Sequence, residues 1–144
     1  HVVHGRKLGR ALAEGAPGRG DGFRTLNLRF SRRAHAWKPA ASGIFVVEVH
    51  GLDEQPLPGV ANLGVRPSLD PNDVNGGRVL LETHVLDWPA HLGPEGAYGK
   101  IIRVDLLYKL HDELRYHSLA ALTEGIARDC ADARRWLAAR AARI

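Results

Sequence analysis

The sequence predicts a mainly β domain, a small antiparallel barrel or sandwich, followed by one C-terminal helix. Short runs dense in Val, Ile and Leu are separated by turn residues through most of the chain, and the carboxyl end changes to helical spacing. A length of 144 residues suits one domain with a single core. We therefore expect one domain spanning residues 1–144.

The predicted strands are runs in which apolar and polar residues alternate or β-branched residues dominate. Four such runs cover residues 43–50, 60–65, 78–87 and 100–110. Residues 67–73 contain two prolines and therefore cannot lie inside a helix. With a further strand expected near residue 25, five or six short strands result, and this number is typical of a small barrel or sandwich.

The carboxyl end predicts a long helix that lies against the strands. Ser118 is suited to the N-cap position, and the apolar residues that follow are spaced by three or four. Cys130 falls on this apolar stripe, so we expect a buried, inert thiol rather than a nucleophile. As the lone cysteine it also excludes an internal disulfide and a cysteine-rich zinc site. The stripe consists of Leu119, Leu122, Ile126, Cys130, Ala133 and Leu137.

The composition predicts a soluble, cytoplasmic domain with no membrane partner. No run approaches the roughly 20 apolar residues that a membrane span needs, and the amino end lacks the apolar core of a signal peptide. The chain starts at a histidine and contains no methionine, so we expect a piece of a longer polypeptide. A net charge of +4 favours anionic ligands, either nucleotides or nucleic acid, although only 6% of residues are aromatic.

Thr25 and Asn27 form the first candidate site, a magnesium and phosphate site. In an extended chain, residues two apart lie on one face about 7 Å apart, and hydroxyl and amide oxygens are ligands that magnesium accepts. The glycine-bearing basic run at residues 4–10 lies upstream and suits an anion. A turn followed by an ordinary half-buried strand would look the same.

Glu82 is the second candidate, as a general base. It lies in the middle of a predicted strand and shares a face with Leu80, His84 and Leu86, while the alternate residues take the other face. A carboxylate among aliphatic residues can accept a proton if it faces a partly closed cleft. A solvent-facing position on an edge strand is the alternative.

Taken in order, the motifs resemble the riboflavin kinase domain. They are Val-Val-His-Gly-Arg-Lys-Leu-Gly-Arg at 2–10, Gly-Phe-x-Thr-x-Asn-Leu at 22–28, a Val-Ala-Asn-Leu-Gly-Val-Arg-Pro run within 58–68, Leu-Glu-Thr-His-Val-Leu-Asp at 81–87 and Tyr-Gly-Lys at 98–100. The resemblance extends over essentially the whole chain, including the terminal helix. In bacteria this domain is usually the C-terminal half of a bifunctional riboflavin kinase and FAD synthetase.

The resemblance implies a six-stranded antiparallel Greek-key barrel that transfers phosphate from Mg-ATP to the ribityl 5′-hydroxyl of riboflavin, giving FMN and ADP. It also implies a covalently linked N-terminal nucleotidyltransferase domain, absent from this chain, that adenylates FMN. Neither nucleic acid nor a membrane is an expected partner.

The resemblance also assigns roles on the ATP side. Thr25 and Asn27 match the magnesium and phosphate ligands, and Glu82 matches the catalytic base. Gly5 and Arg10 match the ATP loop, and Tyr98 and Gly99 fall where the family lines its nucleotide side. The ATP-binding set is therefore Gly5, Arg10, Thr25, Tyr98 and Gly99.

On the flavin side, the segment 110–118 matches the loop that leads into the helix, with His111, Glu113 and Tyr116 as flavin-binding residues. Relatives typically carry arginine in place of His111 and phenylalanine in place of Tyr116. They also carry proline where this chain has Arg24, and residues 13–21 look like an insertion in the ATP loop.

These departures leave two alternatives open. One is a weakened or silent flavin-binding or assembly module of the same fold. The other is a small basic barrel that binds nucleic acid through its arginines, with an affinity that falls steeply with salt.

Overall fold

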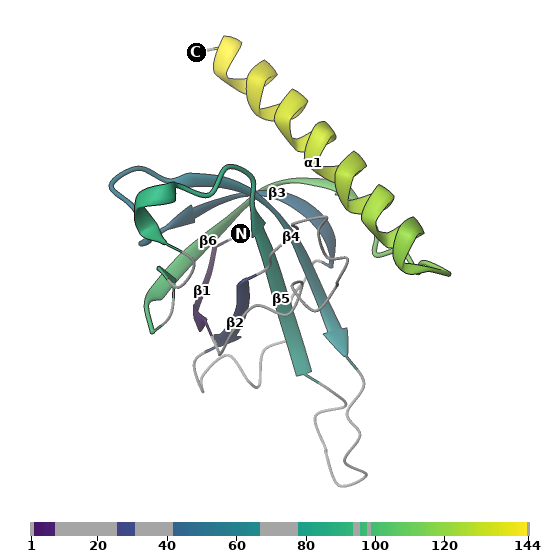
Figure 1. Cartoon of the computed structure of the whole chain (residues 1–144), viewed down its shortest axis with the longest axis horizontal. Helices are drawn as coiled ribbons and strands as arrows, with labels where there is room; N and C mark the ends of the chain where they lie inside the picture. The colour runs from purple at the N-terminus through teal and green to yellow at the C-terminus, as the bar shows by residue number, and fades with distance from the viewer. Residues whose placement is uncertain are drawn as a thin grey trace, which may run out of the picture.

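The computed structural model describes residues 2–7, 26–30, 42–66, 78–93, 96–97 and 99–143. Figure 1 shows the strands gathered on one side of the molecule and a single long helix lying across them. The elements are β1 (Val2–Lys7), β2 (Leu26–Phe30), β3 (Gly43–His50), β4 (Leu57–Arg66), β5 (Arg78–Val85), the 3₁₀ turn η4 (Ala90–Leu92), β6 (Ile101–His111) and α1 (Leu119–Ala142).

Strands β5, β4, β3 and β6 are neighbours in that order, and every pair is antiparallel. β1 pairs with β6 and with β2, and β2 pairs with β5. The predicted mainly β class with one C-terminal helix is confirmed. The predicted run at 43–50 coincides with β3, and β4, β5 and β6 lie within a few residues of their predicted bounds.

Alternation along the strands separates two faces of the sheet. On β5, Leu81 and Val85 belong to the main apolar core, and Thr83 is fully buried on the same side of the strand. We call this side of the sheet the core face. Glu82 and His84 fall on the opposite side, as predicted, and this side is the helix face because α1 covers part of it. The core face is completed by a large apolar cluster that includes Phe45, Val47, Val49, Leu57, Ala61, Leu63, Ile102, Val104 and Leu106.

A second, smaller cluster joins the helix face to α1. Cys130 and Ala133 from the helix pack against residues of β3, β4 and the end of β5. Burial raises the pKa of the Cys130 thiol to about 11, as expected for a buried, unreactive cysteine. The helix-side cluster consists of Ile44, Val46, Val60, Leu86, Cys130 and Ala133.

The start of α1 and its second half are fixed by specific polar contacts. Ser118 is the N-cap, as predicted, and its Oγ accepts a hydrogen bond of 3.0 Å from the amide of Ala121. Farther along, the Arg134 guanidinium donates two hydrogen bonds, of 2.8 and 3.0 Å, to the Asp87 carboxylate just after β5. These contacts hold the helix across the sheet.

The predicted apolar stripe is wrong at its start. Leu119 is 51% exposed and Leu122 is 39% exposed. Neither belongs to the helix-side cluster, and Leu122 lines a cavity instead. Among the described residues, no helix is long and apolar enough to cross a membrane. The cytoplasmic location stays a prediction.

Candidate functional site: a cavity between the sheet and the helix

A cavity of about 310 Å³ lies between the helix face of the sheet, the start of α1 and the segment that connects β6 to α1. Its volume falls at the lower end of the range for small-molecule sites. Four residues predicted for the site, Glu82, His111, Glu113 and Tyr116, all line this one cavity. The full lining is Ile44, Val60, Ala61, Asn62, Glu82, His84, His111, Glu113, Leu114, Tyr116, Leu122, Ile126 and Asp129.

The strand registers line up a row of residues along the floor of this cavity. Glu82 on β5 lies directly opposite Asn27 on β2 and opposite Asn62 on β4. Asn62 is in turn opposite Ile44 on β3, and Ile44 is opposite His111 on β6. Directly opposed residues in antiparallel strands have Cβ atoms about 5 Å apart. The predicted base therefore lies between a predicted magnesium ligand and the predicted flavin residues.

The helix-face position of Glu82 follows from its two neighbours. Leu81 and Thr83 are both 0% exposed on the core face, so the two-residue repeat puts the carboxylate on the other side. Glu82 is half-buried and lines the cavity, so the alternative of a solvent-facing edge position is wrong. β5 has a hydrogen-bonded neighbour on each side.

Two glycines make room for the connecting segment that forms one wall of the cavity. A Cβ atom at Gly64 on β4 would overlap the Glu113 carboxylate, and one at Gly125 on α1 would overlap the Tyr116 hydroxyl. Both glycines are buried. Because neither has a side chain, Glu113 lies close against the sheet and Tyr116 close against the helix.

His111 joins the end of β6 to the helix. Its Nε2 lies 2.7 Å from Asp129 Oδ1, and its Nδ1 lies 2.6 Å from the carbonyl oxygen of Asp112. Both ring nitrogens thus face acceptors, and only the protonated imidazole can donate to both. Burial alone would lower the pKa of His111, but these two hydrogen bonds and the charges of Asp129 and Asp112 outweigh it and raise the pKa.

The remaining predicted site residues lie elsewhere or outside the described residues. Gly5 belongs to strand β1, which pairs with β2 and β6. The first part of the glycine-and-basic run is therefore a strand and not the expected loop. Gly99 adopts φ +73°, a conformation that glycine favours. The described part of the chain does not include Arg10, Thr25, Tyr98, Arg24 or residues 13–21. For Asn27 it includes the backbone but not the side chain.

Asn62 and Asp129 are polar cavity residues that sequence reasoning missed. Asn62 belongs to the run at 58–68 that carries the family resemblance, and its helix-face position follows from the apolar residues on either side. Asp129 belongs to α1 and lies one turn beyond Ile126, another cavity residue. The strand repeat could have identified Asn62, whereas only the fold reveals that Asp129 meets His111.

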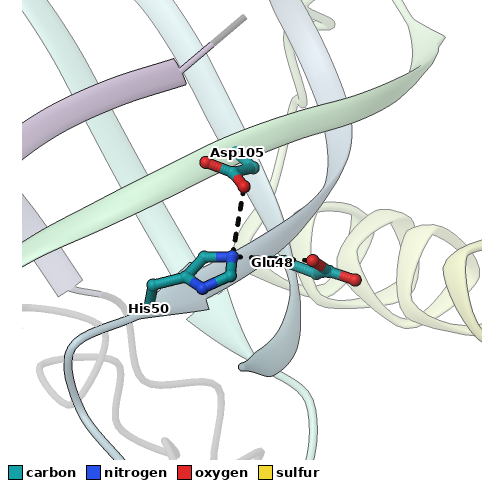
Figure 2. Close-up of side chains that lie close together, drawn as sticks. All are labelled: Glu48, His50 and Asp105. Atoms are coloured by element: carbon teal, nitrogen blue, oxygen red, sulfur yellow. Dashed lines mark ion pairs between the residues drawn. The ribbon is translucent and has the colours of Figure 1, made fainter. Parts of the chain in front are cut away.

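A second polar cluster lies outside the cavity, on β3 and β6. Figure 2 shows His50 between Glu48 and Asp105, with its Nε2 3.1 Å from Asp105 Oδ2 and 3.6 Å from Glu48 Oε2. One potential ligand atom from each of the three residues lies within 4.8 Å of the other two, which is close enough for a metal ion to bind all three. However, Arg103 Nε lies 3.0 Å from Asp105 Oδ1, and Arg140 Nη1 lies 3.3 Å from Glu48 Oε1. Two cations thus balance the two carboxylates, and the cluster is an ion-pair network between β3, β6 and α1.

Comparison with known proteins identifies a family model and several relatives. The family model described as "Flavokinase: Riboflavin kinase" matches residues 1–137. The bifunctional riboflavin kinase/FMN adenylyltransferase of Escherichia coli K12 is 42% identical over 128 residues, which is 89% of this chain and 34% of that protein. The protein of the same name from Pseudomonas fluorescens is 37% identical over 133 residues, covering 92% and 35% of the two chains.

Two further matches differ in what their names say. The RNA-binding riboflavin kinase RibR of Bacillus subtilis is 30% identical over 128 residues, covering 89% of this chain and 45% of that protein. A crystal structure of a macrolide-efflux protein from Streptococcus pneumoniae matches 94% of this chain and 38% of its own, with a TM-score of 0.70 and 23% identity. This last likeness indicates a shared fold only. The chain spans about a third of the length of the bifunctional relatives.

Proposed function

Because the chain belongs to the riboflavin kinase family, we propose that it transfers phosphate from Mg-ATP to the ribityl 5′-hydroxyl of riboflavin, giving FMN and ADP. The observation that carries the proposal is the convergence of Glu82, His111, Glu113 and Tyr116 on one cavity. Asn27, the predicted magnesium ligand, is next to Glu82 in register.

The charge of the cavity suits the flavin rather than the triphosphate. Three carboxylates line it, those of Glu82, Glu113 and Asp129. His111 is paired with Asp129, but the charges of Glu82 and Glu113 would repel phosphate groups. Riboflavin is uncharged, and its ring would meet the apolar side chains of Leu114 and Leu122, both of which are exposed. ATP would then approach from the side of β1 and β2, where Gly5, Arg10, Thr25, Tyr98 and Gly99 are the proposed nucleotide residues.

Glu82 would act as the general base in an in-line transfer. Its carboxylate would accept the proton of the 5′-hydroxyl, while the hydroxyl oxygen bonds to the γ-phosphorus and the bond to the ADP oxygen breaks. Thr25 and Asn27 would hold a magnesium ion, whose charge neutralises the phosphates during such transfers. Their hydroxyl and amide oxygens are donors that magnesium accepts, and the position of Asn27 opposite Glu82 supports a magnesium site beside the base.

Two larger features complete the proposal. The six strands would close into a Greek-key barrel, which is supported by the pairing of β1 with both β2 and β6. In the full-length protein the domain would be linked to an N-terminal FMN adenylyltransferase domain, as the names and lengths of the bifunctional relatives suggest.

The test is to incubate the chain with riboflavin, ATP and magnesium and to measure FMN by chromatography. We expect product from the wild type, and a kcat lower by about 10²- to 10⁴-fold for Glu82→Gln, because general-base catalysis is typically worth that much. Riboflavin binding, followed by quenching of flavin fluorescence, should stay within a few-fold in the variant. Equal turnover by the variant would remove Glu82 from this role.

The same assay separates the alternatives. Saturable riboflavin binding without FMN would indicate a silent flavin-binding module. An absence of nucleic-acid binding stays a prediction, and one relative is named as RNA-binding. RNA binding that weakens steeply with salt, with no FMN formed, would favour the nucleic-acid alternative.

A further inference from the structure

Asn62 occupies a place in the cavity that the predicted roles do not explain. It lies in the middle of β4, directly opposite Glu82 on one side and Ile44 on the other. Its neighbours Ala61 and Leu63 are each 1% exposed and belong to the main core, so Asn62 belongs to the helix face. It lines the same cavity as Glu82.

The carboxamide of Asn62 is poorly matched to the protein groups around it. Its Oδ1 is buried and has no hydrogen-bond partner among the residues that the structure describes. Buried polar atoms nearly always have a partner, because leaving one unpaired costs free energy. Asparagine is also depleted in strand interiors, and at this position it caps no helix and forms no turn. The fold alone therefore gives no reason for an amide here.

We propose that the Asn62 carboxamide hydrogen-bonds a secondary hydroxyl of the ribityl chain and so holds the polyol beside Glu82. This inference rests on the proposed function. A hydroxyl donates and accepts, so it can pair with the amide whichever way the amide is turned. If the terminal hydroxyl lies at Glu82, the residue one strand away meets a neighbouring hydroxyl, because the ribityl chain carries a hydroxyl on each carbon from C2′ to C5′.

The order of residues along the cavity floor supports this arrangement. The registers run from Glu82 through Asn62 and Ile44 to His111, that is, from the proposed base to the wall of the proposed flavin-ring site. The ribityl chain joins the reacting hydroxyl to the ring, so it would cross the floor at Asn62. A polar side chain there would favour a polyol over an apolar chain of equal length, which makes Asn62 a specificity residue.

The test compares two flavins on three proteins. Riboflavin and lumiflavin share the ring, but lumiflavin has a methyl group in place of the ribityl chain. We expect Asn62→Leu to weaken riboflavin binding by about 3- to 10-fold, the effect of one lost hydrogen bond, and to leave lumiflavin binding within 2-fold. Asn62→Ser retains a hydroxyl and should recover part of the riboflavin affinity. In the FMN assay the loss should appear in KM more than in kcat.

Thermal unfolding of the unliganded variants excludes a purely structural role. Because Asn62→Leu removes an unpaired buried oxygen, its Tm should equal or exceed that of the wild type. Equal losses for both flavins, or no loss for riboflavin, would overturn the inference. If wild type binds riboflavin and forms FMN while Asn62→Leu keeps full affinity, only the inference fails; if wild type does neither, the proposed function fails and the inference with it.

Discussion

The two faces of β5 differ in chemistry although their residues alternate along one strand. On the core face, Leu81 and Thr83 are fully buried and Val85 nearly so. On the helix face, Glu82 and His84 line a cavity. The core face packs into one large apolar cluster that includes residues of β2, β3, β4 and β6. The helix face is covered at one end by the helix-side cluster and elsewhere by the segment that connects β6 to α1, which packs against Gly64 and Gly125. The site exists because a helix and a loop cover the sheet less completely than this apolar cluster does.

The sharpest test of this comparison uses adjacent residues. Leu81→Ala should lower the free energy of unfolding by about 2–5 kcal/mol, because it leaves a cavity in the main core. Glu82→Gln should change it by only about 0.5 kcal/mol, since the half-buried side chain keeps its shape. Urea denaturation of both variants measures the difference. If Glu82→Gln destabilises the protein as much as Leu81→Ala, the helix face is a structural core and not a site.

Residues that follow a local rule were predictable, and residues that depend on distant partners were not. The two-residue repeat placed Glu82, and the capping preference of serine identified Ser118. Asp129 lies 18 residues from His111 along the chain, and no spacing rule brings a strand end to a helix at that separation. The cavity wall depends on Gly64 and Gly125 in the same way, because the reason for each glycine is a side chain from another element.

His111 offers a smaller test at the edge of the site, through pH. Its pKa is raised in the folded protein by hydrogen bonds to Asp129 and the Asp112 carbonyl, which outweigh the opposing effect of burial. The protonated imidazole therefore stabilises the fold fully below its unfolded-state pKa of about 6.5, and this contribution is lost as the pH rises through the raised value. The other ionisable groups of the cavity are Glu82, His84, Glu113 and Tyr116.

We expect wild type to be more stable than His111→Gln, and the difference between their free energies of unfolding to be about 1 kcal/mol larger at pH 6 than at pH 8.5. A hydrogen bond to a charged group contributes free energy of this order. Urea denaturation at the two pH values measures this change. His111→Arg carries a permanent charge and serves as the matched control. The difference between its free energy of unfolding and that of His111→Gln should not change between these pH values. A difference between wild type and His111→Gln that grows with pH would contradict the assignment.

The smallest expected effect compares two unpaired polar atoms on opposite faces. Thr83 Oγ1, like Asn62 Oδ1, is buried without a hydrogen-bond partner among the described residues, but Thr83 lies on the core face and is not among the residues that line the cavity described above. Thr83→Val keeps the shape and removes the unpaired hydroxyl, so it should raise the free energy of unfolding by up to about 1 kcal/mol and leave riboflavin binding unchanged. Thr83→Ser, which keeps the hydroxyl and loses a methyl group, should lower the free energy of unfolding by about 1 kcal/mol. A loss of flavin affinity in Thr83→Val equal to that in Asn62→Leu would mean that the two faces are coupled, and the place of Asn62 beside the cavity would then no longer identify it as the residue that contacts the flavin.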